Sequence, residues 1–117
     1  EESTIFQKYP RIMQDHFAIA FICDTYHHFE FPQKTMTSLR KAMKPGGRVI
    51  VIDFRRVEGE STEWTMNHVR AGQEVFEAEI AKAGFRRVQE VQGLLKENYM
   101  LVFTTADVPS DEKKDTN

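Results

Sequence analysis

The strongest constraint on this fold is a pair of apolar segments separated by a helical pattern and a glycine turn. Residues 17 to 23, FAIAFIC, carry no charge and place apolar side chains at both alternating sets of positions, which predicts a strand buried on both faces. Residues 48 to 54, RVIVIDF, are rich in β-branched residues and predict a second strand. Between them, residues 32 to 43 predict a helix that opens with proline, and KPGG at 44 to 47 predicts the turn that ends it. This order predicts a right-handed parallel βαβ unit.

Further helices and strands follow this unit. Ser61 or Thr62 is placed to cap a short helix, and a longer helix after it ends at Gly84. The segments FRRVQEV at 85 to 91 and NYMLVFTT at 98 to 105 predict two strands, and their short connection indicates an antiparallel hairpin.

We therefore expect one α/β domain whose sheet carries helices on both faces. Residues 1 to 106 form this domain in our interpretation. Residues 107 to 117 are polar and nearly free of core-forming side chains, which predicts a disordered tail.

Composition and charge narrow the classes of function. The 117 residues are 40% apolar and 29% charged with a formal net charge of -2, which is typical of an ordinary globular domain. They contain no basic stripe of the kind that nucleic-acid binding needs, so we expect no nucleic-acid partner. No apolar stretch approaches the roughly 20 residues of a membrane span, and the first ten residues do not resemble a signal peptide. We expect a cytoplasmic protein with no membrane partner.

The only cysteine, Cys23, lies in the first apolar segment. A disulfide within the chain needs two cysteines, so none can form, and a reducing compartment is expected. Because free cysteine is among the most buried residue types, we predict that Cys23 is buried.

Three segments and two short motifs carry a resemblance to a known family. The segments are residues 17 to 54, residues 68 to 85 with the sequence HVRAGQEVFEAEIAKAGF, and residues 97 to 105 with the sequence ENYMLVFTT. The motifs are KPGG before an apolar strand and AGF at 83 to 85. In this order they resemble the C-terminal portion of the class I S-adenosylmethionine-dependent methyltransferases of the small-molecule type. The resemblance implies a partial Rossmann-like methyltransferase sheet and S-adenosylmethionine as cofactor.

One part of that family's pattern is missing from these residues. The family's sheet begins with a strand that feeds a glycine-rich turn, where backbone N–H groups approach the cofactor at the start of a helix. The only paired glycines here, Gly46 and Gly47, precede the second strand instead. We therefore interpret the chain as the C-terminal part of a methyltransferase-like domain that lacks the glycine-rich half and is not an autonomous methyltransferase.

Two other functions stay open, and both involve self-association. One is a self-associating α/β module that binds a small ligand, and the other is an active methyltransferase whose cofactor site is shared between two chains. In that family the strand at 17 to 23 is central, and without its neighbour it presents a long apolar edge that invites pairing. We expect a homodimer, joined at this strand or by exchange of the N-terminal segment STIFQ at 3 to 7.

Polar residues follow both predicted parallel strands. Because the carboxyl ends of parallel strands meet at one rim, where open α/β sheets bind ligands, residues 24 to 28 and 53 to 56 should lie together. The resemblance implies a division of roles at this rim. Cofactor binding falls to Asp24, Thr25 and Tyr26, catalysis to His27 and His28, and small-molecule substrate binding to Asp53, Arg55, Arg56 and Arg70.

His27 and His28 are candidates for a general base, because histidine titrates near neutral pH. The competing interpretation is that one histidine bonds to backbone as a polar cap of the loop and the other is solvated, with Arg70 a plain solvated charge. A metal site would need both histidines together with His68 and Asp24 or Asp53. Adjacent side chains usually point apart and no HExxH pair is present, so we predict no metal site.

Overall fold

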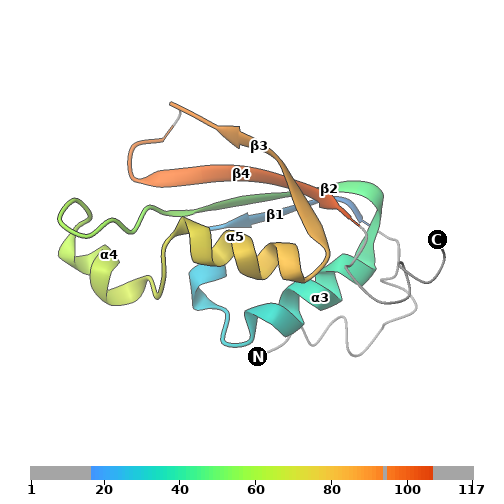
Figure 1. The fold of residues 1–117 in the computed structure, drawn as a ribbon, viewed down its shortest axis with the longest axis horizontal. Helices are drawn as coiled ribbons and strands as arrows, with labels where there is room; N and C mark the ends of the chain where they lie inside the picture. Colours follow the sequence, from blue (N-terminus) through green and yellow to red (C-terminus); the bar gives the residue numbers. More distant parts are fainter. Residues whose placement is uncertain (1–16, 94, 107–117) are drawn as a thin grey trace.

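The computed structural model describes residues 17 to 93 and 95 to 106, which form one mixed sheet with helices against it (Figure 1). The sheet has four strands in the order β1-β2-β4-β3. They are β1 Phe17–Cys23, β2 Met43–Phe54, β3 Phe85–Val91 and β4 Asn98–Thr105. The helices are the short 3₁₀ turn η1 Tyr26–His28, α3 Pro32–Ala42, α4 Glu63–His68 and α5 Gln73–Lys82. None of the helices in the described ranges is long and apolar enough to cross a membrane.

The predicted βαβ unit is confirmed. β1 and β2 pair in parallel, and α3 connects them. Pro32 is the first residue of α3, where a missing N–H leaves no helical hydrogen bond unmade. Arg40 then anchors the helix to the rest of the domain, because its guanidinium donates to the carbonyl oxygens of Gly84 at 2.9 Å and Ala106 at 3.0 Å.

The KPGG segment differs from the predicted turn, because it lies inside strand β2. Phe17 pairs with Met43 and Ile19 with Arg48, so residues 44 to 47 bulge out of the ladder with β1. A Cβ on Gly47 would lie 2.8 Å from the Met43 side chain and 3.1 Å from the Ala18 carbonyl oxygen. Glycine suits this position because any side chain would crowd Met43 and the β1 backbone, which would have to shift to admit it.

The shorter elements follow the sequence signals. The Thr62 side chain caps α4 by accepting a hydrogen bond from the backbone N–H of Thr65. Val69 follows the last residue of α4 as its C-cap and is buried in the core. Gly84 follows the last residues of α5 with φ of +107°, a conformation that favours glycine at the end of a helix.

The expected helices on both faces are not what the described residues show. β4 is antiparallel to both β2 and β3, so β3 runs parallel to β2. The connections from β1 to β2 and from β2 to β3 therefore advance across the sheet in the same direction. Because such crossovers are right-handed, their helices belong on the same face, and α3 and α5 indeed contact each other below the sheet (Figure 1).

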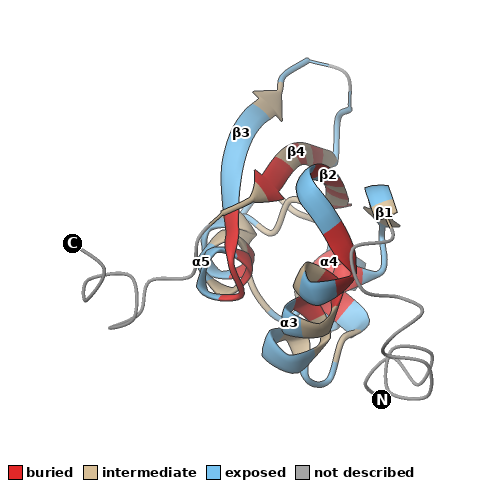
Figure 2. Cartoon of the chain, turned by 90° about the vertical axis from the view of Figure 1, so that its right-hand side faces the viewer, coloured by how far each residue is buried: buried red, intermediate tan, exposed pale blue. Residues whose placement is uncertain are grey.

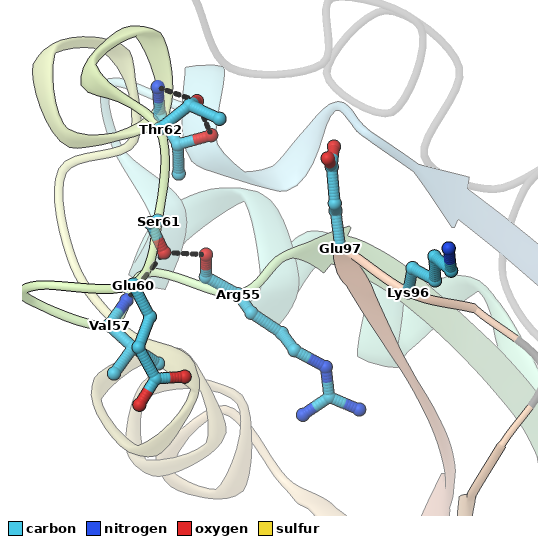
Figure 3. A pocket seen from close by; sticks show the side chains of 8 residues that line it. Arg55, Val57, Glu60, Ser61, Thr62, Lys96 and Glu97 are labelled. Carbon is cyan, nitrogen blue, oxygen red and sulfur yellow. Dashed lines mark hydrogen bonds between the residues drawn. The ribbon is translucent and has the colours of Figure 1, made fainter.

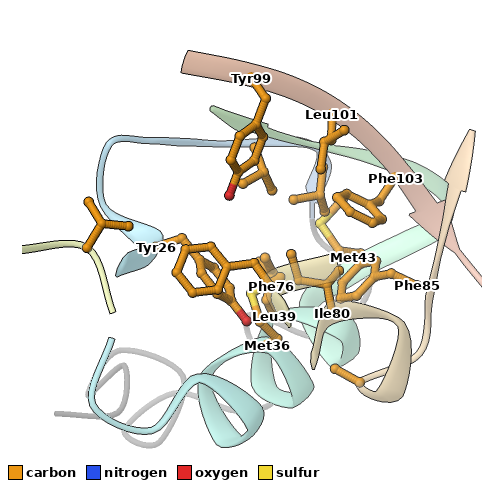
Figure 4. Close-up of a cluster of buried hydrophobic side chains, with 14 residues drawn as sticks. Tyr26, Met36, Leu39, Met43, Phe76, Ile80, Phe85, Tyr99, Leu101 and Phe103 are labelled. Carbon is orange, nitrogen blue, oxygen red and sulfur yellow. The ribbon is translucent and has the colours of Figure 1, made fainter. Parts of the chain in front are cut away.

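One hydrophobic core lies between this face and the two helices (Figure 4). The β2 residues Val49 and Val51 point into it from the sheet, and Phe76 and Ile80 meet them from α5. Side chains at these positions are almost completely removed from water, which supplies most of the favourable free energy of folding. The core also contains Tyr26, Met36, Leu39, Met43, Val69, Ala83, Phe85, Tyr99, Leu101 and Phe103.

Strand β1 is not buried on both faces as the sequence predicted. Ala20 and Ile22 pack against the core, whereas Ile19 is 64% exposed and Phe21 is 59% exposed. β1 is an edge strand in the described part of the sheet, and Figure 2 shows it mostly intermediate and exposed while β2 and β4 carry buried residues. The side chains of Ile19 and Phe21, on the other face of β1, therefore have no covering layer among the described residues. The predicted exchange segment at 3 to 7 and the predicted tail at 107 to 117 lie outside those residues.

The burial predicted for Cys23 is wrong as well, because the cysteine is exposed at the end of β1. Its side chain belongs to the same uncovered set of positions as Phe21. Local desolvation and the nearby carboxylates of Asp24 and Asp53 raise the pKa of the thiol, so it stays in the less reactive protonated form at neutral pH.

Candidate functional site

The candidate site begins at the carboxyl end of β1, where Asp24 turns the chain out of the sheet. Asp24 has φ of +53°, a left-handed conformation that aspartate tolerates better than most residues. Its backbone N–H still donates to the Ile52 carbonyl at 2.8 Å, and its carboxylate accepts from the Asn98 amide at 2.8 Å. Desolvation and the neighbouring Asp53 raise the pKa of Asp24. The loop therefore leaves the sheet along a fixed path.

A histidine and a buried aspartate meet at the end of this turn. His27 Nδ1 lies 2.8 Å from Asp53 Oδ1, and the backbone N–H of His27 donates to Asp53 Oδ2 at 3.0 Å. The backbone N–H of Phe54 also donates to Oδ1, at 2.7 Å. An ionised carboxylate can only accept, so this arrangement places the imidazole proton on Nδ1 and leaves Nε2 with a free lone pair in the neutral ring.

His27 Nε2 is buried and has no hydrogen-bond partner among the described residues. The hydroxyl of Tyr99 and Nε of Arg56 are the other such side-chain atoms. Tyr99 pairs with Asp53 across the ladder between β2 and β4 and reaches into the layer between sheet and helices (Figure 4). An unpaired buried polar atom costs about 1 to 3 kcal/mol, which marks such positions as places where a ligand gains a hydrogen bond.

The two neighbouring histidines have different environments. His27 is buried and bonds to a side-chain carboxylate, rather than to backbone as the polar-cap interpretation supposed. His28 is exposed, and its ring centroid lies 4.1 Å from that of His27. Only His27 has the fixed orientation that a general base needs. The described residues contain no group of three or more His, Cys, Asp or Glu side chains that could hold a metal ion.

Tyr26, which the resemblance placed at the cofactor, instead belongs to the core. It is completely buried, and its hydroxyl donates to Glu79 Oε1 at 2.9 Å. Arg70 donates to both oxygens of the same carboxylate, at 2.9 and 2.8 Å, and lies over the Phe76 ring. The η1 turn is therefore tied to α5 through Glu79, and both terminal nitrogens of Arg70 are occupied by an anion of the chain itself.

This network shifts the protonation of its members. Burial and the bond to Glu79 raise the pKa of Tyr26 far above its ordinary value. Burial alone would raise the pKa of Glu79, but the hydrogen bonds from Arg70 and Tyr26 outweigh it and lower that pKa. The hydrogen bond to Glu79 raises the pKa of Arg70. The sequence interpretation missed Glu79, because no spacing rule connects it to Tyr26, which lies 53 positions away.

The structure also gives the contacts of Asp53, Thr25 and Arg56 at the rim. Asp53, expected to meet substrate, is fully buried and positions His27. The Thr25 hydroxyl donates to the Cys23 carbonyl at 2.8 Å, and Arg56 donates to the Met66 carbonyl at 3.3 Å. In this structure the three side chains lie at one rim and form hydrogen bonds within it.

Arg55 faces a separate recess of about 120 Å³ beside the end of β2 (Figure 3). The Ser61 hydroxyl fixes its wall by donating to the Arg55 carbonyl at 2.7 Å and accepting from the Val57 N–H at 2.8 Å. The charged side chains that line it, Arg55, Glu60, Lys96 and Glu97, form no ion pair with another described residue. This recess does not include the histidine and aspartate pair.

Comparison with known proteins gives a likeness in structure only. No family model matches the sequence, and no curated protein matches it. A SAM-dependent methyltransferase from Aquifex aeolicus superposes with a TM-score of 0.67 at 17% identity, over 80% of this chain and 48% of that one. The N-methyltransferase NodS from Bradyrhizobium japonicum, solved with S-adenosyl-L-homocysteine, gives 0.60 at 17% identity, over 78% and 47%. This chain has the partial fold of a class I methyltransferase.

The methyltransferase-like chain thus spans about half the length of these structures. The same likeness extends to a [4+2]-cyclase, SpnF, with a TM-score of 0.65 at 12% identity, over 82% of this chain and 52% of that one. One fold therefore carries different chemistry, and function has to be argued from the site.

The residues expected to hold the cofactor do not form a pocket for it within the described ranges. Asp24 and Thr25 are exposed at the turn, and Tyr26 is enclosed in the core. The sequence has no glycine-rich turn after a strand to supply the backbone N–H groups that bind such a ligand. What the described residues do provide is an oriented histidine at the rim.

The hydrogen bonds from Tyr26 and Arg70 to Glu79 should make the free energy of unfolding depend on pH. Replacement Glu79→Gln is expected to lower the free energy of unfolding by about 1 kcal/mol near pH 7, because two charge-assisted partners lose their anion at a partly exposed position. The pKa of Glu79 is lowered below its ordinary value of 4.5. The stabilisation is therefore complete above that value and is lost as the pH falls through the folded-state pKa.

Urea unfolding of both proteins between about pH 7 and pH 2 measures this effect. Glu74→Gln, at an exposed position of the same helix, is the matched control and should change stability by less than about 0.5 kcal/mol. A loss for Glu79→Gln that is the same at both ends of the pH range would contradict the assignment.

Proposed function

We propose that this chain supplies the proton-accepting side of an S-adenosylmethionine-dependent methyltransferase domain and is not an autonomous methyltransferase. The observation that carries the proposal is His27, held by the buried Asp53 with Nε2 left unpartnered among the described residues. The pair lies at the carboxyl end of parallel strands, where open α/β sheets bind ligands. The structural likeness to methyltransferases supports the reaction class.

In this proposal the acceptor is a hydroxyl or amine that must lose a proton when it is methylated. S-adenosylmethionine, for which the described residues form no pocket, would supply the methyl group when bound. His27 Nε2 takes the acceptor's proton and later releases it to water. Asp53 keeps the ring in the required tautomer and stabilises the imidazolium that forms, as an aspartate does for a histidine base in general.

The tautomer of His27 is the first test of this proposal. In the unchanged protein, nitrogen-15 NMR should show neutral His27 protonated at Nδ1, because that nitrogen faces Asp53 Oδ1. In Asp53→Asn the amide can donate to Nδ1, so the proton should move to Nε2 and remove the base. Asp24→Asn, the same change at the exposed neighbouring carboxylate, should leave the tautomer unchanged. Protonation at Nε2 in the unchanged protein would sink the proposed base.

Calorimetric titration with S-adenosylmethionine tests whether the chain is autonomous. We expect no saturable binding at millimolar cofactor, because no glycine-rich turn is present to bind it. Micromolar binding that depends on dimer formation would contradict this expectation. It would instead support an active methyltransferase with a cofactor site shared between two chains.

We further propose that a second copy of the chain pairs with the β1 edge, as in a self-associating ligand-binding module. Ile19 and Phe21 are largely exposed on this strand. Residues 17 to 23 contain no charge and no proline, the features that normally protect an exposed edge from pairing. A second copy of the chain has the same exposed strand edge. In a two-fold dimer the β1 edges of the two copies would therefore pair with each other.

Light scattering after size exclusion should give twice the chain mass of 13.6 kDa for the unchanged protein. Phe21→Lys should yield monomers, because it places a charge on the paired edge. Phe31→Lys is the matched control, since Phe31 is 48% exposed but lies at the start of α3. A monomeric unchanged protein with fast hydrogen exchange in β1 would rule the dimer out.

A further inference from the structure

The sheet has one covered face and one open face. Side chains alternate along each strand, so Val49 and Leu101 point toward α3 and α5, whereas their neighbours point to the opposite side. No helix of the described ranges lies on that side of the sheet (Figure 1). The outer face, as we call it, consists of the paired strand residues that point there. Its apolar centre is formed by Ile19, Phe21, Ile50, Ile52, Met100 and Val102.

One end of the outer face carries positive charge only. Thr104 pairs with Arg48 on one side and with Arg86 on the other, so two exposed arginines lie at the same end of the sheet. Neither arginine forms an ion pair with another described residue. The paired positions of the outer face contain no acidic residue that could compensate these charges. The outer face is therefore apolar at its centre and cationic at one end.

The parallel pairing of β1 and β2 indicates which kind of element covers such a face. Parallel strands joined by helices usually carry helices on both faces of their sheet, because the strands are apolar on both sides. β1 has seven residues and is roughly 23 Å long, which is the length of a helix of about 15 residues. A second copy stacked face to face would instead bring two arginines from each copy together without a paired acidic residue, so charge disfavours it. Pairing of two β1 edges leaves the outer face open.

We propose that the outer face binds an amphipathic helix of another polypeptide, whose apolar stripe covers the centre and whose acidic end lies over Arg48 and Arg86. Burial of apolar side chains supplies most of the affinity, and carboxylates accept charge-assisted hydrogen bonds from the two guanidinium groups. The chain spans about half the length of the methyltransferase structures that it resembles, which agrees with a layer supplied by a partner. This inference does not depend on the proposed role of His27.

A designed peptide stands in for the partner in the test. It has about 16 residues, with leucine at the i, i+3, i+4 and i+7 spacing of one helix face and glutamates in its first turn. Fluorescence anisotropy of the labelled peptide should show saturable binding to the unchanged protein. A second peptide with lysine in place of each glutamate should bind about tenfold more weakly, because it loses charge-assisted hydrogen bonds. A third peptide with serine in place of each leucine should show no saturable binding.

Charge reversal tests the cationic end of the outer face. Arg48→Glu should weaken binding of the glutamate peptide about tenfold and strengthen binding of the lysine peptide, because the sign of the contact is exchanged. Lys41→Glu, the same kind of change at an exposed position of α3 on the covered side of the sheet, should alter neither affinity. Far-ultraviolet circular dichroism confirms that both variants are folded.

Equal affinity for the glutamate and lysine peptides would overturn the inference, and so would equal effects of Arg48→Glu and Lys41→Glu. Absence of saturable binding would also overturn it, whether a second copy or another part of the chain covers the outer face. The His27 tautomer is measured separately, so failure of peptide binding leaves the proposed function standing. Protonation of His27 at Nε2 with saturable peptide binding rejects the base and keeps the docking surface.

Discussion

The buried carboxylate of Asp53 is the interaction on which the rest of the site depends. It stands at the end of the central strand β2 with no exposure to solvent, where an unpaired carboxylate would be very costly. Three N–H groups, two from His27 and one from Phe54, satisfy it. The same bonds fix the η1 turn, orient the imidazole and leave its Nε2 without a hydrogen-bond partner among the described residues. The need to satisfy the buried Asp53 carboxylate thus fixes the conformation of the loop and also orients His27, the proposed base.

Support for this arrangement comes from the opposite side of the turn. Tyr26 enters the core next to His27, and its hydroxyl donates to Glu79 of helix α5, which also accepts hydrogen bonds from Arg70. The turn is therefore held from the sheet by Asp53 and from the helix by Glu79. The Glu79 anchor is partly exposed, so it contributes less to the stability of the turn than the buried Asp53 anchor. Its contribution also depends on pH.

The sequence led to much of the fold because its strongest signals are local. The charge-free strands, Pro32 at a helix start and Gly84 at a helix end each specify their own conformation. The errors arose where position in the sheet decides the outcome. Residues 17 to 23 were predicted to be buried because they are apolar, yet the described neighbours cover only one face. Helices were expected on both faces, yet two crossovers in the same direction place α3 and α5 together.

The candidate site shows the same contrast between features set by local sequence and features set by the tertiary structure. The sequence by itself determined that residues 24 to 28 and 53 to 56 share a rim, because parallel strands must end together. It could not distinguish His27 from His28, or show that Asp53 and Tyr26 turn inward while Trp64 stays half exposed. Only the tertiary structure decided these points, because the direction of each side chain depends on contacts with residues distant in the chain. Asp53 lies 26 positions from His27 and Glu79 lies 53 from Tyr26, separations at which no local pattern operates.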